Sequence, residues 1–399
     1  MKEIKWAVLG CGVIANEMAV ALQKNGKNIY AVGNRTHEKA AAFAEKYGIG
    51  KVYDDFHEMF TDPEVDVIYI TTPHNTHLGF MKEAIANGKH ILVEKSITLN
   101  SDELDEAIAL AKEKDVIIGE AMTIYHMPIY KELKKILDSG RLGRVNLITM
   151  NFGSFKEYNM KNRFFNRNLA GGAMLDIGVY ALSFLRWFFD SKPDQLLSQV
   201  KPAPTGVDEQ AGLLLTNQEG QMASVMLSLH SKQPKRGMVS CENGFIEIME
   251  YPRAWEAKIT DASTGESEII KAGDNADALA YELADMERAI NGDASAMHLD
   301  YTKDVMDLMT SFRRTWGYTY PEEENKIRTS KAPARHTSDA GRGTSFHLQY
   351  SAIFFFSNSA SIGFAICTSM PASFAACRSS TKALALMAKI GMEAASSRP

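Results

Sequence analysis

Up to residue 121, short runs of β-branched and other apolar residues alternate with stretches that have the apolar period of an amphipathic helix. Strands that alternate with helices predict a parallel, doubly wound sheet of the α/β class. The runs expected to form strands are Ile4–Leu9, Ile29–Val32, Val67–Ile70, Ile91–Val93 and Val116–Ile118. The helices expected between them include Asn75–Asn87 and Ser101–Lys114.

From about Val145 the pattern changes, because one short strand candidate follows another with few helices between them. This order predicts a second domain of the α+β class, built on a largely antiparallel open sheet. The strands expected here are Val145–Phe152, Ala211–Leu215, Met222–Leu229, Phe245–Ile248, Ala257–Ile259 and Glu268–Ile270. The expected helices are Gly172–Phe189, Ala276–Asn291 and Tyr301–Trp316.

The composition of this 399-residue chain excludes several classes of protein. With 45% hydrophobic and 23% charged residues, we expect a soluble globular protein and no polytopic membrane protein. The formal net charge of −5 provides no general attraction for nucleic acid or an anionic membrane, so the expected partner is a small molecule. The cysteines have no metal-ligand spacing and the N-terminus has no secretory segment, which predicts a cytoplasmic protein without a disulfide framework. The four cysteines are Cys11, Cys241, Cys367 and Cys377.

The last part of the chain has a different character. Residues 326–399 hold 9 of the Lys and Arg residues and 2 of the Asp and Glu residues, so this tail is positive although the whole chain is negative. It contains the run Phe354–Phe356 and shows no sustained helical or strand period. The stretch Ala352–Met370 has nearly the length of a membrane span, but serine and asparagine residues interrupt its middle. We expect a poorly ordered appendage that targets no membrane.

A glycine-rich turn follows the first expected strand and opens a helix. This context is typical of a dinucleotide-binding site, because the backbone of such a turn approaches a pyrophosphate at the helix N-terminus. The alternative is a tight turn that serves packing alone. The residues of the turn, all expected to contact the cofactor, are Gly10, Cys11, Gly12, Val13, Ile14 and Ala15.

The end of the second expected strand bears on the choice of cofactor. An NAD site usually presents Asp or Glu there to bind the ribose hydroxyls. Here the sequence is Gly33-Asn34-Arg35-Thr36, in which no acid is present and Arg35 offers a guanidinium suited to a 2′-phosphate. This favours NADP. NAD stays possible if Arg35 is an ordinary solvated residue and Asn34 alone binds the ribose.

Polar segments follow two further strands, at the strand ends where open α/β sheets bind ligands. They are Thr71–His77 and Glu94-Lys95-Ser96, and Gly171–Tyr180 lies farther along the chain. With the glycine turn, these motifs occur in an order and spacing that resemble the glucose–fructose oxidoreductase/inositol dehydrogenase (Gfo/Idh/MocA) family of NAD(P)-dependent oxidoreductases. The ending at Tyr180 is most similar to its dihydrodiol dehydrogenase and sugar dehydrogenase branch. The resemblance covers roughly residues 1–322.

The resemblance places the family's catalytic lysine on Lys95, its helix aspartate on Asp176 and a tyrosine on Tyr180. The i, i+4 spacing of Asp176 and Tyr180 puts both on one helix face, from which they can meet Lys95. We expect Lys95 to lower the pKa of Tyr180, so that the pair acts as acid and base near neutral pH. Taken singly, each residue has a purely structural alternative. Besides the turn, the expected cofactor contacts are Asn34, Arg35, Thr71, Pro73, Asn75, His77, Glu94 and Lys95.

Two positions depart from the family pattern. Ser96 stands where a proline normally follows the Glu-Lys pair, and Tyr125 stands where relatives commonly have arginine. The backbone at Ser96 and the inner wall of the pocket are therefore open at this stage. His74 and His77 have the spacing of a metal pair but no third ligand nearby, so cofactor or substrate contact is favoured and no metal is expected.

Together these features predict an oxidoreductase that acts on a CH–OH group of a sugar, polyol or trans-dihydrodiol. The alternative is a non-catalytic NADP-binding regulator or sensor that retains the fold. We expect residues 1–121 to form a Rossmann dinucleotide-binding domain, residues 122–325 an α+β substrate and oligomerisation domain, and residues 326–399 the atypical tail. The sheet of the second domain is the expected homo-oligomer surface.

Overall fold

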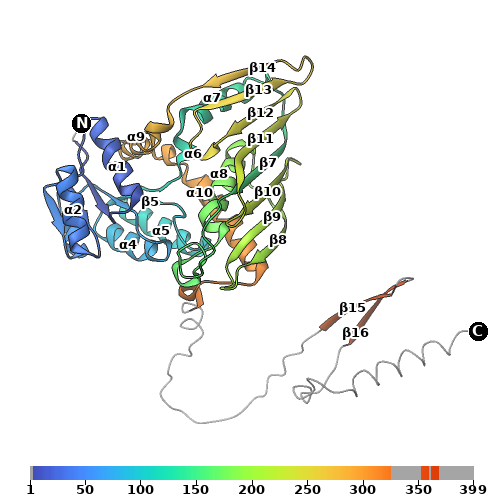
Figure 1. Ribbon diagram of the computed structural model, residues 1–399, viewed down its shortest axis with the longest axis horizontal. Helices are drawn as coiled ribbons and strands as arrows, with labels where there is room; N and C mark the ends of the chain where they lie inside the picture. Colours follow the sequence, from blue (N-terminus) through green and yellow to red (C-terminus); the bar gives the residue numbers. More distant parts are fainter. Residues whose placement is uncertain (1–2, 325–351, 359–360, 368–399) are drawn as a thin grey trace, which may run out of the picture. The chain divides into compact units, whose positions relative to one another are not determined.

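The computed structural model describes residues 3–324, 352–358 and 361–367 (Figure 1). The chain divides into two units, residues 1–332 and residues 333–399. The two described segments of the second unit are β15 (Ala352–Asn358) and β16 (Ser361–Cys367), which pair in antiparallel register. The sequence did not predict these strands. The rest of the expected poorly ordered tail lies outside the described residues.

The first sheet has six parallel strands in the order β3-β2-β1-β4-β5-β6. Its central strands are buried along their whole length, because helices cover both faces. The strand order reverses between β1 and β4, and open α/β sheets bind ligands at such a point. The strands are β1 (Trp6–Leu9), β2 (Ala31–Gly33), β3 (Lys51–Tyr53), β4 (Val67–Ile70), β5 (His90–Glu94) and β6 (Ile118–Ala121).

The helices of this first part follow the strands in turn. Local chemistry defines their ends: the Asn100 side chain accepts a hydrogen bond from Glu103 N at 2.9 Å at the start of α5, and Gly48 ends α2 in the left-handed region. The helices are α1 (Val13–Lys24), α2 (His37–Tyr47), α3 (Phe56–Thr61), α4 (His77–Ala86) and α5 (Ser101–Lys114). The predicted doubly wound sheet is confirmed, with β3 as an additional edge strand.

The second sheet has eight strands in the order β14-β13-β12-β11-β7-β10-β9-β8. Its neighbours are antiparallel except β7 and β10, which run parallel, so the predicted largely antiparallel sheet is confirmed. Strands β8 and β11 were not predicted. The strands are β7 (Val145–Gly153), β8 (Gln195–Pro202), β9 (Asp208–Thr216), β10 (Met222–Ser228), β11 (Gln233–Cys241), β12 (Gly244–Met249), β13 (Glu256–Asp261) and β14 (Ser267–Lys271).

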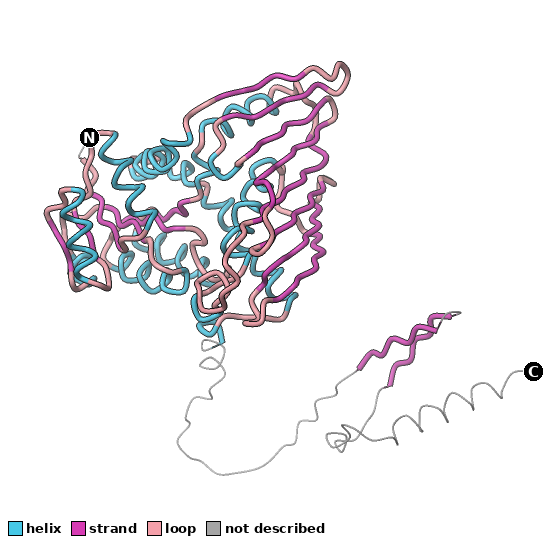
Figure 2. The backbone as a smooth tube through the Cα atoms, in the orientation of Figure 1, coloured by secondary structure: helices cyan, strands magenta, loops and turns pink. Residues whose placement is uncertain are grey.

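Helices cover one face of this sheet. Figure 1 shows α6, α7, α8 and α10 on the side that faces the first sheet, and the trace in Figure 2 agrees. No helix from residues 3–324 covers the opposite face. The helices are α6 (Thr123–His126), α7 (Pro128–Asp138), α8 (Val179–Phe188) and α10 (Leu299–Trp316).

Helix α9 (Ala278–Ile290) belongs to the expected second domain by sequence but packs against the Rossmann half. Its buried residues Leu283 and Met286 share one hydrophobic cluster with Met18 and Leu22 of α1. Trp6 Nε1 also donates a hydrogen bond to Glu287 Oε1 at 3.2 Å. A segment from the second half of the chain therefore completes the core of the Rossmann half.

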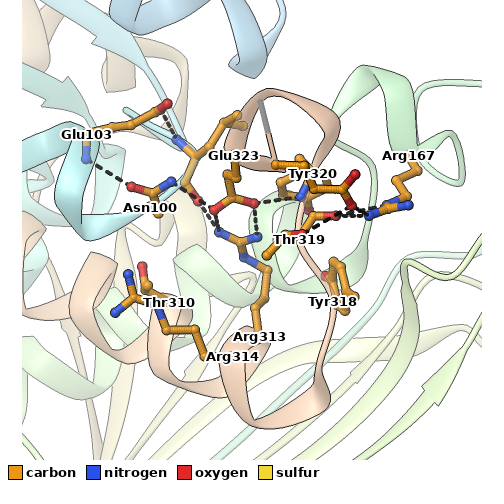
Figure 3. A network of polar contacts seen from close by, with 12 residues as sticks. Asn100, Glu103, Arg167, Thr310, Arg313, Arg314, Tyr318, Thr319, Tyr320 and Glu323 are labelled. Atoms are coloured by element: carbon orange, nitrogen blue, oxygen red, sulfur yellow. Dashed lines mark hydrogen bonds and ion pairs between the residues drawn. The ribbon is translucent and has the colours of Figure 1, made fainter. Parts of the chain in front are cut away.

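A short segment after α10 joins the two halves, and we call residues 317–324 the strap. Arg313 precedes it with only 2% of its surface exposed, and its guanidinium binds both carboxylate oxygens of Glu323 at 2.9 and 3.1 Å (Figure 3). Arg313 also donates to the Leu99 carbonyl, and Asn100 Nδ2 donates to Glu323 at 2.8 Å. The strap is therefore fixed against the start of α5.

The strap also has contacts in both halves of the molecule. The Tyr320 hydroxyl donates to the Gly171 carbonyl at 2.7 Å, and Asn75 Nδ2 donates to Glu322 at 2.7 Å. Arg167 Nε donates to the Thr319 carbonyl at 2.8 Å. The strap thus contacts both the Rossmann half and the segment that leads into α8.

Among the described residues, the stretch Arg167–Phe188 is the one helical segment whose length and composition would allow it to cross a membrane. Most of this stretch is buried inside the protein. Its apolar character is therefore that of a core helix.

Candidate active site

The glycine turn between β1 and α1 has the shape that a dinucleotide site needs. Gly10 has a φ of +106°, and a Cβ there would lie 2.5 Å from Thr71 Oγ1, so the position admits no side chain. Gly12 caps α1, and a Cβ there would meet nothing within 4 Å. The helix N-terminus behind this open space presents unpaired N–H groups, which bind phosphate. The residues present therefore fit a dinucleotide.

Lys95, Asp176 and Tyr180 lie together, although the first comes from the Rossmann half and the others from the second domain. Lys95 Nζ donates to the Asp176 carbonyl at 2.8 Å and lies 3.4 Å from Asp176 Oδ1. The same ammonium lies 4.8 Å from the centre of the Tyr180 ring. The expected helix in fact begins with a π-helical turn, Met174–Gly178, that leads into α8. Even so, both side chains reach Lys95.

Burial and charge set the protonation states of this group. Burial alone would raise the pKa of Asp176, but Lys95 and then Arg163 hold it below its ordinary value. Burial alone would lower the pKa of Lys95, but Tyr180, Asp176 and Glu94 raise it. Lys95 is therefore a cation and Asp176 an anion at neutral pH.

The expectation of a neutral-range pKa for Tyr180 is not met. Burial raises the pKa of the Tyr180 hydroxyl above its ordinary value, and the opposing charge of Lys95 does not cancel that effect. Desolvation of a phenolate outweighs the attraction of one ammonium at this distance. At neutral pH Tyr180 is therefore a phenol that can donate a proton.

A cleft of about 470 Å³ lies between the glycine turn and these residues. Its wall combines candidates from the turn with candidates from β4, β5 and the second domain. Arg163 and Phe164 also line it, and Arg163 lies 3.6 Å from Asp176 Oδ1. The sequence-predicted residues that the cleft brings together are Gly12, Val13, Ile14, Thr71, Pro73, Glu94, Lys95, Asp176 and Tyr180.

Two family models match the chain. The one described as "Oxidoreductase family, NAD-binding Rossmann fold" matches residues 4–122, and the one described as "GFO/IDH/MocA C-terminal domain" matches residues 130–247. The chain is also 31% identical over 248 residues to the trans-1,2-dihydrobenzene-1,2-diol dehydrogenase of Xenopus tropicalis. The aligned region covers 61% of this chain and 74% of that protein. The chain belongs to the GFO/IDH/MocA family.

One longer alignment and two solved structures extend the comparison. The human trans-1,2-dihydrobenzene-1,2-diol dehydrogenase is 25% identical over 333 residues, which is 80% of this chain and 99% of that protein. The aldose–aldose oxidoreductase of Caulobacter crescentus has a TM-score of 0.70 at 22% identity and covers 78% of this chain and 97% of its own. KijD10, a 3-ketoreductase from Actinomadura kijaniata, has a TM-score of 0.70 at 20% identity and covers 78% and 98%. The two solved structures share the fold.

Several predicted contacts of this GFO/IDH/MocA protein lie outside the cleft lining. His77 is fully buried, and its ring nitrogens face the carbonyls of Thr72, Ser96 and Ile97 at 2.8 to 3.2 Å. Such contacts position the backbone of the cleft wall. The other predicted residues outside this lining are Gly10, Cys11, Ala15, Asn34, Arg35 and Asn75.

Their surroundings differ from one to the next. Cys11 lines a neighbouring groove along α1, and burial raises the pKa of its thiol to about 11. Asn34 Nδ2 donates to the Thr36 carbonyl at 3.0 Å. Arg35 is exposed and forms no ion pair with any residue that the structure describes. Ala15 is buried under the sheet.

The two departures from the family pattern now have a structural description. The Lys95–Ser96 peptide bond is cis, and Ser96 Oγ donates to the Leu175 carbonyl at 2.9 Å. Tyr125 is fully buried among Trp187, His298 and Tyr301 and does not line the cleft.

Unlike His77, His74 is part of the cleft lining. His74 Nε2 lies 2.9 Å from the Lys95 carbonyl, and burial lowers the pKa of His74 to about 3. In the described part of the chain, no group of three or more His, Cys, Asp or Glu residues is placed to hold a metal ion. The contacts of the strap with Gly171 and Asn75 were missed, because no local sequence pattern announces such distant partners.

The two glycines of the turn should separate folding from binding. Gly10→Ala should lower the free energy of unfolding by about 1–3 kcal/mol, since a backbone with positive φ must then accommodate a Cβ beside Thr71. Gly12→Ala should leave the free energy of unfolding within about 0.5 kcal/mol but weaken binding of NADP+. Urea denaturation and calorimetry measure the two effects. If Gly12→Ala binds NADP+ as tightly as the wild type does, this turn is not part of the cofactor site.

Proposed function

We propose that this protein is an NADP-preferring dehydrogenase that interconverts a CH–OH group and a carbonyl of a sugar, polyol or trans-dihydrodiol. The observation that carries the proposal is the meeting of Lys95, Asp176 and Tyr180 in the cleft beside the glycine turn. A sensor has no need of a proton-transfer group, so this set favours an enzyme over a regulator. The similarity to trans-dihydrodiol dehydrogenases and to an aldose–aldose oxidoreductase supports this range of substrates.

Each member of the set has a distinct role in the proposed mechanism. When bound, the nicotinamide supplies the hydride chemistry. The Tyr180 hydroxyl gives a proton to the carbonyl oxygen in reduction, and its phenolate takes that proton back in oxidation. Lys95 stabilises the phenolate and the substrate oxygen through its positive charge. Asp176 holds Lys95 in place and balances its charge.

The raised pKa of Tyr180 predicts the direction of the pH dependence. Below that pKa the phenolate is scarce, so kcat/KM for alcohol oxidation should rise up to tenfold per pH unit through the alkaline range. Lys95→Ala should lower kcat at least about a hundredfold and move the rise to higher pH, because the charge that lowers the pKa of Tyr180 is gone. Tyr180→Phe should abolish the rise.

Initial-rate profiles with one oxidised substrate, found in a screen of sugars, polyols and dihydrodiols, provide the measurement. Near-normal turnover by Lys95→Ala would contradict the assignment of Lys95. A Tyr180→Phe enzyme that keeps the alkaline rise would move the acid–base role to another group.

The preference for NADP rests on Arg35. Its exposed guanidinium is without an ion pair among the described residues, and no carboxylate stands at the end of β2 to bind ribose hydroxyls instead. KijD10 binds NADP in its crystal structure, which supports the same cofactor here.

Arg35→Ala should therefore cost about 1.5–3 kcal/mol of NADP+ binding, the range for a charge-assisted hydrogen bond. NAD+ binding serves as the matched control and should change little, because NAD+ lacks the 2′-phosphate. Calorimetry measures both. If NADP+ binds equally to the wild type and the variant, Arg35 is not the anchor.

We also propose that a second copy of the chain covers the open face of the eight-stranded sheet. Leu197 and Leu214 are direct neighbours in the β8–β9 register and are 69% and 51% exposed, and Met226 on β10 is 49% exposed. Monomeric proteins rarely leave such adjoining apolar residues uncovered.

Sedimentation velocity should therefore find an oligomer at micromolar concentration. The double variant Leu197→Glu/Leu214→Glu should sediment as a monomer, whereas the control Val20→Glu on α1 should not change the assembly. A monomeric wild type would refute this interface.

A further inference from the structure

The second-domain wall of the cleft carries more positive charge than its carboxylate can neutralise. Asp176 is the acid within ion-pair distance of Arg163, at 3.6 Å, and it also pairs with Lys95 at 3.4 Å. Lys156 does not itself line the cleft, but it interacts electrostatically with Asp176, Arg163 and Lys95 and forms no ion pair with a described residue. Glu94, the other acid of the cleft lining, is half-buried and accepts a hydrogen bond from Tyr69.

The Phe164 ring contacts two cations, Arg163 of the cleft lining and Lys156 outside it. Lys156 Nζ and the Arg163 guanidinium carbon each lie 4.3 Å from the centre of the Phe164 ring. Such contacts fix the direction of a cation but do not neutralise its charge. The Arg163 side chain is 59% exposed, so its donors remain accessible from the cleft. Arg163 and Phe164 therefore form a positively charged platform, with Lys156 beside it.

The charges of this platform act on one another. Burial lowers the pKa of Lys156, and the neighbouring cations Arg163, Lys95 and Lys235 lower it further, although Asp176 opposes them. Lys235 has its own partner, Glu250, at 2.9 Å. The repulsion around Lys156 is what a bound anion would relieve, because an opposite charge at close range favours the charged form.

The position of the platform indicates which molecule this anion belongs to. Arg163 and Phe164 belong to the second domain and line the cleft together with Asp176 and Tyr180. The phosphates of a dinucleotide are expected at the glycine turn, on the Rossmann half. A neutral polyol would leave the platform without a counter-charge. The chemistry at this wall suits a group with two or more oxygens that share a negative charge, which arginine binds through paired donors.

We propose that the substrate carries an anionic group, a carboxylate or a phosphate, which Arg163 and Lys156 bind beside Phe164 while Lys95 and Tyr180 meet the reacting oxygen. This inference rests on the proposed dehydrogenase function and defines its substrate class. A sugar acid and a sugar phosphate share this chemistry.

Calorimetry on the full chain saturated with NADP+ tests the platform directly, because the cofactor then fills the other phosphate site. The probes are inorganic phosphate and acetate, which need no matching stereochemistry. Arg163→Gln and Lys156→Gln should each weaken the tighter probe at least tenfold, and Arg163→Lys should lose less. Lys161→Gln, the same charge change at an exposed neighbour, should bind as the wild type does.

Tighter binding of phosphate would assign a phosphorylated substrate, and tighter binding of acetate would assign a carboxylated one. Equal affinity in the wild type, Arg163→Gln and Lys156→Gln would overturn the proposal, and so would the absence of measurable binding by either probe. The affinity should fall as salt is added, since exposed charges are screened.

A substrate screen separates this failure from failure of the proposed function. D-glucose, D-glucuronate and D-glucose 6-phosphate form a matched set within a wider screen of neutral and anionic sugars, polyols and dihydrodiols. A neutral substrate with a KM as low as its anionic counterpart, unaffected by Arg163→Gln, would overturn the platform but leave the dehydrogenase in place. If no compound reduces NADP+ or NAD+, the dehydrogenase proposal fails, and the inference about its substrate falls with it.

Discussion

The buried ion pair between Arg313 and Glu323 is the constraint on which the arrangement of the two halves depends. The Arg313 side chain is 2% exposed and that of Glu323 is 11% exposed, so removal of one partner would leave a largely buried charge uncompensated and cost about 3–5 kcal/mol. The pair fixes the strap against α5 through Leu99 and Asn100. The same strap binds the Gly171 carbonyl, which belongs to the cleft wall. The stability of the fold and the geometry of the site therefore share one anchor.

The site itself is held by contacts that cross between the halves. Lys95 and Ser96 donate to consecutive carbonyls, those of Asp176 and Leu175, at 2.8 and 2.9 Å. Buried polar groups are costly unless they are paired, so these bonds leave the loop after β5 few alternative positions. The charge on Lys95 is retained in this buried place because Tyr180, Asp176 and Glu94 surround it. A lysine alone in the same position would lose its proton more readily.

The sequence predicted the elements whose pattern is local. The buried run Val67–Ile70 and the capped helix Ser101–Lys114 occur with the predicted bounds. The family resemblance and the i, i+4 spacing predicted that Lys95, Asp176 and Tyr180 lie close together, and the structure brings the three together. Their catalytic roles stay predictions.

The missed elements lack such a local signal. Strand β3 has three residues, and β8 alternates between exposed and half-buried positions, so neither offers an apolar run. Strand β11 contains Pro234 and Gly237, residues that are typical of a turn. The strap and the packing of α9 on α1 depend on partners hundreds of residues away. The pKa of Tyr180 was expected to fall because the charge of Lys95 is visible in a motif, whereas the larger effect of burial is not.

The π-helical turn Met174–Gly178 explains how one short segment serves both the fold and the chemistry. In a π turn the N–H groups bond one residue farther back, as Val179 N does to the Met174 carbonyl, and the turn is wider than in an α-helix. The carbonyls of Leu175 and Asp176 accept further donors from the loop after β5. Backbone oxygen atoms thus fix Lys95, and the Asp176 carboxylate is left to balance its charge and that of Arg163.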